Sequence, residues 1–96
     1  MNLGNIIKKT RKQRNQTQEE FALSCGITQT YLSQIENNLK EPNLSTLKTI
    51  SNNLEIPLPI MFFLSLTEDD IQLNKKEAFE LIRPSVKSLV DEYFTV

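Results

Sequence analysis

Apolar residues recur at helical spacing along the chain, and no segment alternates in the way of a half-buried strand. The first apolar group, Leu3 with Ile6 and Ile7, continues into a basic segment that ends at Arg14. This pattern predicts an amphipathic helix with one apolar and one cationic face. The chain as a whole predicts helices over residues 3–14, 17–25, 28–37, 43–54 and 60–66.

The first half of the chain contains residues that are typical of helix starts and helix ends. Thr17 and Glu20 form a T-x-x-E capping box, in which each side chain satisfies a free backbone amide of the other. Gly26 follows the second predicted helix, where a left-handed residue ends a helix at little cost. Thr28 is a cap residue for the third helix, and Asn37-Asn38 can close it because Asn tolerates the left-handed conformation.

The fourth and fifth predicted helices differ in their apolar surface. After Pro42 and Asn43, four residues should share one buried face of the fourth helix: Leu44, Leu47, Ile50 and Leu54. The fifth helix, which follows Pro57 and Pro59, is apolar nearly all round. A helix of this kind should be covered on both sides.

The C-terminal segment carries apolar residues at steps of three and four, typical of a helix that packs against another helix: Phe79, Ile82, Val86, Leu89 and Tyr93. Pro84 interrupts the pattern and predicts a kink or two shorter helices. Thr67 with Asp70 makes one further cap signature. The segment either joins two subunits or folds back on its own domain.

Composition excludes several classes of protein. The chain of 96 residues has no His and a single Cys, Cys25, so it has neither the usual ligands of a zinc site nor a His-based catalytic centre. The acidic pairs Glu19-Glu20 and Asp69-Asp70 fall in predicted first helical turns, where the helix dipole favours anions. We therefore do not interpret them as catalytic carboxylates. We expect no enzyme activity, no cofactor and no metal. The longest apolar run, Ile60–Leu64, is far shorter than the roughly 20 residues of a membrane span, so we expect a cytoplasmic protein.

Charge is divided unevenly. Residues 1–48 carry seven Lys and Arg against four Asp and Glu, whereas residues 49–96 carry four against eight. This division favours a polyanion-facing N-terminal half, although ordinary surface variation gives the same pattern.

The second and third predicted helices, joined at Gly26, have helix-turn-helix proportions. The outer face of the third helix is uncharged but rich in amides and hydroxyls. A Gln side chain can form two hydrogen bonds with adenine in the major groove, and a Thr methyl can pack on a thymine methyl. A plain solvated face is the alternative reading.

Here the sequence resembles the Cro/repressor-type, XRE-like helix-turn-helix regulators, from about Leu3 to Leu64. The resemblance rests on the string QTQEEFALSCGITQTYLSQIENNLKEPNLSTLKTISNNLEIPLPIMF. It implies an all-α fold with a five-helix repressor-like DNA-binding domain, which we expect over residues 1–66. The apolar spacing that follows predicts a C-terminal helical extension over residues 67–96, for dimerisation. The third helix would enter the major groove of a two-fold symmetric operator.

The resemblance also implies roles for individual residues. Gln18 matches a position that contacts phosphate and braces Gln29, the first residue of the recognition helix. Gln29, Thr30 and Gln34 match base-reading positions. The remaining DNA-binding candidates lie near the DNA backbone: Ser33, Asn37 and Lys40.

One further feature supports the resemblance, and two others depart from it. Arg11 and Glu36 match an ion pair that ties the first helix to the recognition helix. Asn38 stands where the family usually has Gly, and the recognition helix contains no Lys or Arg. Phosphate contacts must therefore come from backbone amides and from basic side chains outside that helix: Lys8, Lys9, Lys12, Arg14 and Lys40.

The sequence thus predicts a sequence-specific regulator of double-stranded DNA, a dimeric repressor that blocks polymerase access to a promoter. Three alternatives stay open. An antitoxin would bind a toxin, as a protein partner, through its C-terminal helices. A controller of a restriction–modification system would activate transcription. A helical interaction module would have lost DNA binding altogether.

Overall fold

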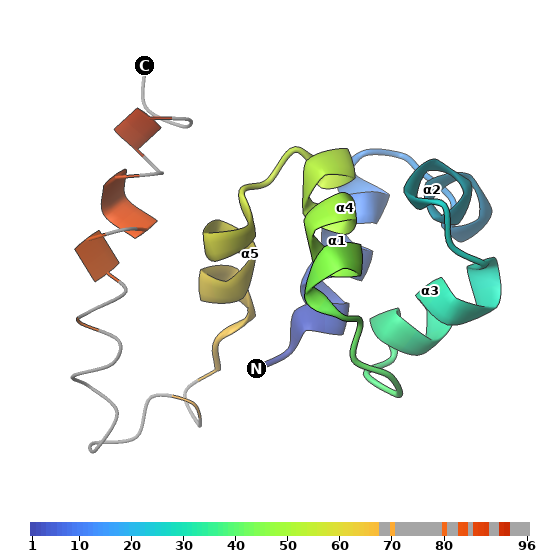
Figure 1. Cartoon of the computed structure of the whole chain (residues 1–96), viewed down its shortest axis with the longest axis horizontal. Helices are drawn as coiled ribbons and strands as arrows, with labels where there is room; N and C mark the ends of the chain where they lie inside the picture. Colours follow the sequence, from blue (N-terminus) through green and yellow to red (C-terminus); the bar gives the residue numbers. More distant parts are fainter. Residues whose placement is uncertain (68–69, 71–79, 81–82, 85, 89–90, 93–96) are drawn as a thin grey trace.

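The computed structural model describes residues 1–67, 70, 80, 83–84, 86–88 and 91–92. The first 65 residues form a bundle of short helices with brief connections (Figure 1). The bounds are Leu3–Gln13 for α1, Gln18–Cys25 for α2, Gln29–Glu36 for α3, Leu44–Leu54 for α4 and Leu58–Ser65 for α5. The described part of the chain contains no strand, so the predicted all-α class is confirmed.

The predicted helix ends around α2 and α3 are confirmed. The Glu20 N–H donates to Thr17 Oγ1 at 3.1 Å, and the Thr17 N–H donates back to Glu20 Oε1 at 3.1 Å. The hydrogen bond from the Thr17 amide is the main cause of a lowered pKa of the Glu20 carboxyl, and the Thr17 side chain adds to it. Gly26 ends α2 with φ +68°, and Thr28 accepts from the Tyr31 N–H at 3.0 Å. The turn between α2 and α3 is thus fixed by local chemistry at both ends.

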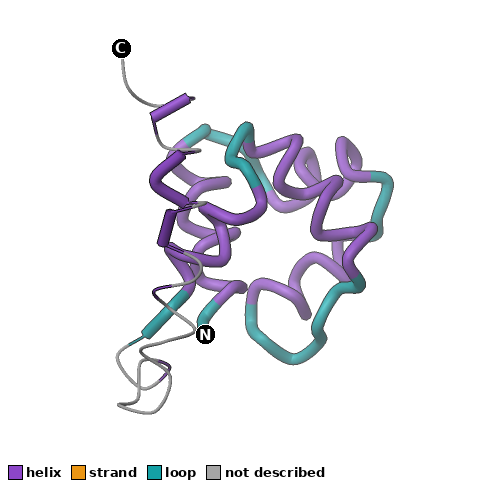
Figure 2. Tube along the Cα trace, turned by 60° about the vertical axis from the view of Figure 1, so that its left-hand side comes forward, coloured by secondary structure: helices purple, strands orange, loops and turns teal. Residues whose placement is uncertain are grey.

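The core lies where α1, α2, α3, α4 and α5 meet. Helix α1 packs against α3, α4 and α5, and α2 packs against α3 and α4. Figure 2 shows these helices arranged around a common centre. Buried apolar side chains form the core there. Five of them have 0% of their surface exposed: Ile7, Phe21, Leu32, Ile50 and Met61.

Helix α4 differs from prediction at its first residue. Asn43 caps the helix by accepting from the Thr46 N–H at 2.8 Å, and Leu47, Ile50 and Leu54 are buried as expected. Leu44, however, is 56% exposed. The predicted apolar face of α4 is therefore buried only from Leu47 onward.

Helix α5 begins earlier than the sequence pattern indicated. The expected start was residue 60, after two prolines, but the helix starts at Leu58 with Pro59 in its first turn. A proline fits there because the first-turn amides have no partner within the helix. The helix is also not covered on both sides by the described residues, since Leu64 is 49% and Phe63 37% exposed.

Beyond α5, the predicted cap signature is present in part. The Thr67 N–H and hydroxyl both donate to Asp70 Oδ2, at 2.8 and 2.9 Å. The described residues from Glu80 to Glu92 have helical backbone, and Val86 is buried. The other members of the predicted apolar seam, and its continuity across Pro84, lie outside the described residues.

Candidate nucleic-acid interface

Helix α3 presents a polar face at the surface. Gln29 and Thr30, in its first turn, are exposed, as is Asn37, which ends the helix. Ser33 and Gln34 are half-buried, and the Asn37 side-chain amide donates to Ser33 Oγ at 3.4 Å. Leu32 and Ile35 point the other way, into the core. The candidates predicted on this helix thus share one accessible side.

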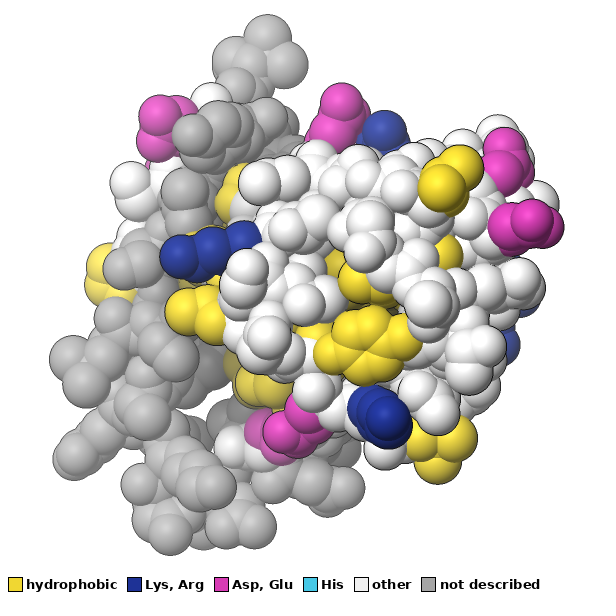
Figure 3. All heavy atoms as spheres, turned by 45° about the vertical axis from the view of Figure 1, so that its right-hand side comes forward, with side chains coloured by type: hydrophobic (Ala, Val, Ile, Leu, Met, Phe, Trp, Pro, Cys, Tyr) yellow, Lys and Arg dark blue, Asp and Glu magenta, His cyan; other side chains and the backbone are white. Residues whose placement is uncertain are grey.

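That side of the molecule carries little charge. Helix α3 contains no Lys or Arg, and its one ionised residue, Glu36, is buried. In Figure 3, most of the described surface in view is white, the colour of the backbone and of uncharged polar side chains, with apolar patches between and charged groups mainly toward the edges. Amides and hydroxyls are therefore the groups that α3 can offer to a ligand, and they are hydrogen-bond donors and acceptors at once.

Glu36 ties α3 to the two preceding helices. Arg11 Nε and Nη2 donate to its two carboxylate oxygens at 2.8 and 3.0 Å, and Arg11 Nη1 donates to the Gln16 carbonyl at 2.7 Å. The two side chains are only 7% and 1% exposed. The ion pair expected from the resemblance is therefore present, bidentate and buried. Its two hydrogen bonds fix the orientation of the Arg11 guanidinium relative to the Glu36 carboxylate.

Gln18 joins this network. Its side-chain amide donates to Glu36 Oε1 at 3.1 Å. The expected bracing of Gln29 by Gln18 has no hydrogen bond in the structure, because the Gln18 amide is oriented by the buried carboxylate instead. Gln18 lies at the N-terminus of α2 and half-buried, so its backbone amide stays available to a phosphate oxygen.

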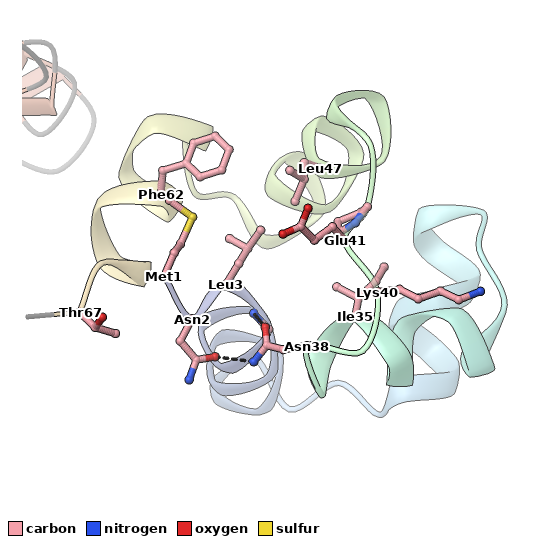
Figure 4. Close-up of a pocket in the computed structure, with 12 residues that line it drawn as sticks. Met1, Asn2, Leu3, Ile35, Asn38, Lys40, Glu41, Leu47, Phe62 and Thr67 are labelled. Carbon is pink, nitrogen blue, oxygen red and sulfur yellow. Dashed lines mark hydrogen bonds between the residues drawn. The ribbon is translucent and has the colours of Figure 1, made fainter. Parts of the chain in front are cut away.

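The candidate phosphate contacts come from α1 and from the α3–α4 loop. Lys9 and Lys12 are exposed, and Lys8 is half-buried. Lys40 is exposed. It is among the residues that line the cavity drawn in Figure 4, but its side chain extends away from the other lining side chains. Arg14 is different, because it forms an exposed ion pair with Glu55 at 3.2 Å that the sequence did not reveal.

A cavity of about 570 Å³ opens between the first turn of α1, the α3–α4 loop and α5 (Figure 4). Leu3, Leu47 and Phe62 form its apolar wall. None of the exposed residues of the α3 helix lines it. The cavity is thus separate from the polar face.

Chemistry of other kinds finds no support in the described residues. They contain no cluster of three potential metal ligands, and none of their helices is long and apolar enough to cross a bilayer. Cys25 is buried, and desolvation raises the pKa of its thiol to about 11. At neutral pH it is therefore a protonated thiol within the core, not a nucleophile.

Comparison with known proteins agrees with this geometry. A family model described as Helix-turn-helix matches residues 7–60, which is more than half of the chain and includes α2, the turn and α3. The chain belongs to the helix-turn-helix family. Within it, the chain is of the Cro/repressor type that its sequence resembles, a family of DNA-binding transcriptional regulators and not of enzymes.

Two relatives are similar over most of the helix-turn-helix region. An immunity repressor protein of Bacillus phage phi105 is 29% identical over 85 residues, which span 86% of this chain and 59% of that protein. Control protein C.MunI of a Mycoplasma species is 40% identical over 60 residues, 62% of this chain and 81% of that protein. The chain thus spans less than two thirds of the length of the phage repressor that it matches.

Two solved structures resemble the fold. A single-substitution mutant of the restriction–modification controller protein C.Esp1396I superposes with a TM-score of 0.60 at 28% identity, covering 66% of this chain and 82% of that one. The clp gene regulator ClgR of Corynebacterium glutamicum gives a TM-score of 0.63 at 16% identity, covering 98% and 92%. The second likeness is one of fold alone.

Proposed function

We propose that this protein binds double-stranded DNA sequence-specifically, with α3 in the major groove. The observation that carries the proposal is the exposed, uncharged polar face of α3. Gln29, Thr30 and Gln34 would read base edges, with Gln favouring adenine and the Thr methyl favouring thymine. Because the helix lacks Arg, guanine would not be read by a bidentate guanidinium.

Backbone contacts would set the register on the duplex. Gln18, Ser33, Asn37 and Lys40 would lie along the phosphates, together with the amides at the start of α2. Few positive charges are available there, so one copy would bind weakly and its affinity would fall with salt. Two copies on a symmetric operator would make up the deficit, since linking two half-sites raises the apparent affinity.

The described surface supports a homodimer through α5. Leu64 of α5 is 49% exposed and offers apolar surface, and the acidic C-terminal segment follows directly. Repression by occlusion is the activity that fits two copies seated across a promoter. The likeness to a phage immunity repressor supports this sign of regulation.

Selection of binding sites from random duplex DNA, at two salt concentrations, tests the DNA proposal. The selected duplex should bind at least about a thousandfold more tightly than scrambled duplex. Gln29→Ala and Gln34→Ala should each relax preference at one base position per half-site, by about 1–3 kcal/mol. Gln13→Ala, which removes an exposed Gln from α1, is the matched control. No preference in the wild type would refute the proposal.

Light scattering across a dilution series tests the dimer. Leu64→Asp should shift the equilibrium toward monomer, because it places a charge in the proposed apolar contact. Leu23→Asp is the matched control, since Leu23 is an 82% exposed leucine on α2, away from α5. Equal dissociation of the two variants would contradict a contact through α5.

A second candidate function is control of a restriction–modification operon. The likenesses to C.MunI and to C.Esp1396I favour it, because both proteins are described as controllers. A promoter reporter carrying the selected site distinguishes the two functions. A repressor that acts by occlusion lowers reporter output when its site overlaps the promoter core and leaves output unchanged from a flanking position. An activating controller raises output from the flanking position.

A further inference from the structure

The recognition helix α3 is joined to α1 by a second polar contact, besides Glu36. Just past the end of α3, Asn38 Oδ1 accepts from the Gly4 N–H at 3.1 Å. The Asn38 side-chain amide donates to Asn2 Oδ1 at 2.8 Å, the hydrogen bond drawn in Figure 4. Asn2 Oδ1 also accepts from the Asn5 N–H at 3.1 Å and so caps α1. We call these residues, Asn2, Gly4 and Asn38, the α1–α3 latch.

The latch depends on an unusually close approach of two backbones. Gly4 is buried, and a Cβ at this position would lie only 2.6 Å from the Glu36 carbonyl oxygen and in a similar clash with that of Ile35. Only glycine lets the first turn of α1 come this near to the last turn of α3. The Gly4 amide is thereby brought within reach of Asn38.

The backbone role of Asn38 does not require its side chain. With φ +58°, its N–H donates to the Ile35 carbonyl at 3.0 Å, and the Leu39 N–H donates to the Gln34 carbonyl at 2.8 Å. This is a Schellman closure of α3, which glycine forms at least as well. The amide side chain therefore adds something that the helix end itself does not need.

Two attachment points along α1 restrain α3 more than one could. Arg11 grips Glu36, and the latch grips Asn38 seven residues earlier, at Gly4. At a rise of 1.5 Å per residue, these points lie about 10 Å apart along α1. Helix α3 is already packed through Leu32 and Ile35, and the second polar contact further restrains its angle to α1 and holds the start of the loop that carries Lys40.

We propose that Asn38 is a positioning residue for sequence readout: through the latch, it sets the angle at which α3 meets DNA. This inference rests on the proposed function. An α3 that could pivot would still meet phosphates but would align Gln29 and Gln34 poorly with base edges. Loss of the latch should therefore lower discrimination more than it lowers overall affinity for DNA.

Glycine-selective ¹⁵N labelling tests the latch itself. The wild type has two glycines, so Gly4 reports on the latch and Gly26 is an internal control. In Asn38→Asp, which keeps the Oδ1 acceptor, the Gly4 amide should stay close to its wild-type shift and remain protected from exchange. In Asn38→Gly it should shift and exchange faster, while Gly26 stays unchanged. An unmoved Gly4 signal in Asn38→Gly would overturn the proposal.

Binding measurements test the consequence. For Asn38→Gly, affinity for the selected duplex should fall roughly five- to tenfold, the equivalent of one lost hydrogen bond, while affinity for scrambled duplex stays within about twofold. Asn38→Asp should be intermediate in the ratio of the two affinities. Asn15→Gly is the matched control, because Asn15 is also left-handed, at φ +57°, but lies outside the latch.

The outcomes separate the two proposals. A wild-type protein without preference for any duplex would remove the proposed function. A wild type that discriminates, combined with Asn38→Gly that discriminates equally well after its Gly4 signal has moved, would remove only the positioning role of Asn38. Because glycine adopts the left-handed conformation readily, Asn38→Gly keeps the backbone closure of α3 and should still fold.

Discussion

Helices α3 and α5 are of equal length but are held in place by different forces. Around α3, a buried ion pair, the Gln18 amide and the Asn38 side chain make directional hydrogen bonds to α1 and α2. Helix α5 has no side-chain cap. One backbone hydrogen bond, from the Asn2 N–H to the Ser65 carbonyl at 2.7 Å, ties its end to α1, and otherwise it is held through Ile60 and Met61 by apolar burial. Apolar contacts are not directional, whereas hydrogen bonds fix an angle as well as a distance.

The difference suits two kinds of contact. A helix that reads base edges must be aligned to within hydrogen-bond geometry, and directional restraints provide this. A helix that packs against a second copy needs apolar area and can adjust its side chains on docking. The polar anchoring of α3 and the open apolar surface of α5 are therefore consistent with readout on one side and association on the other.

The sharpest way to break this comparison is Glu36→Gln. It keeps the shape of the side chain but leaves the Arg11 guanidinium buried without its counter-charge. The free energy of unfolding, measured with urea at pH 7, should fall by about 3–5 kcal/mol. A loss below about 1 kcal/mol would mean that apolar packing, not the ion pair, holds α3.

The corresponding test of α5 is Met61→Ala. Met61 is fully buried, so its truncation should cost about 3 kcal/mol through lost burial and a residual cavity. Leu64→Ala is the control at 49% exposure and should cost less than about 1 kcal/mol when measured at concentrations where the protein is monomeric. Similar losses for the two variants would contradict the one-sided burial of α5.

Cys25 links stability to alkaline pH. Burial raises the pKa of its thiol from 9.0 to about 11, so the folded state disfavours the thiolate. This contribution to the free energy of unfolding is fully present below pH 9 and is lost as pH rises through 11, with about 2 kcal/mol lost by pH 11. Urea unfolding of wild type and Cys25→Ala between pH 8 and 11 measures it. Parallel pH profiles of the two proteins would exclude this linkage.

The smallest effect is expected for Glu55→Gln, the surface counterpart of Glu36→Gln. The ion pair of Glu55 with Arg14 is exposed, so water and salt screen it. Unfolding should change by less than about 1 kcal/mol, and the change should vanish in 1 M salt. A cost similar to that of Glu36→Gln would show that burial does not separate the two ion pairs.

Local chemistry made most of the N-terminal half predictable. Thr17, Glu20, Gly26 and Thr28 act within three or four residues along the chain, so their spacing alone specified the ends of α2 and α3. The family resemblance added Arg11 with Glu36, which no local rule could pair across 25 positions. The all-α class and the helix-turn-helix family were both predicted.

The rest depended on three-dimensional placement. The exposure of Leu44 and the start of α5 at Leu58, before Pro59, both depend on how the helices pack in three dimensions. The Gln18 side-chain amide donates to the Glu36 carboxylate and not to Gln29, the partner that the resemblance implies. The latch of Asn38 required two backbones in contact, and the substitution of Asn for the usual Gly was its only signal in the sequence.

Because α3 bears no outward charge, the proposed complex separates attraction from discrimination. Counterion release would come from the lysines of α1 and from Lys40, whereas base contacts would release none. Rising ionic strength would then shorten the residence time on every duplex by a similar factor and leave the order of preference intact. Such a protein would respond to osmotic stress by changing its occupancy but not its choice of site.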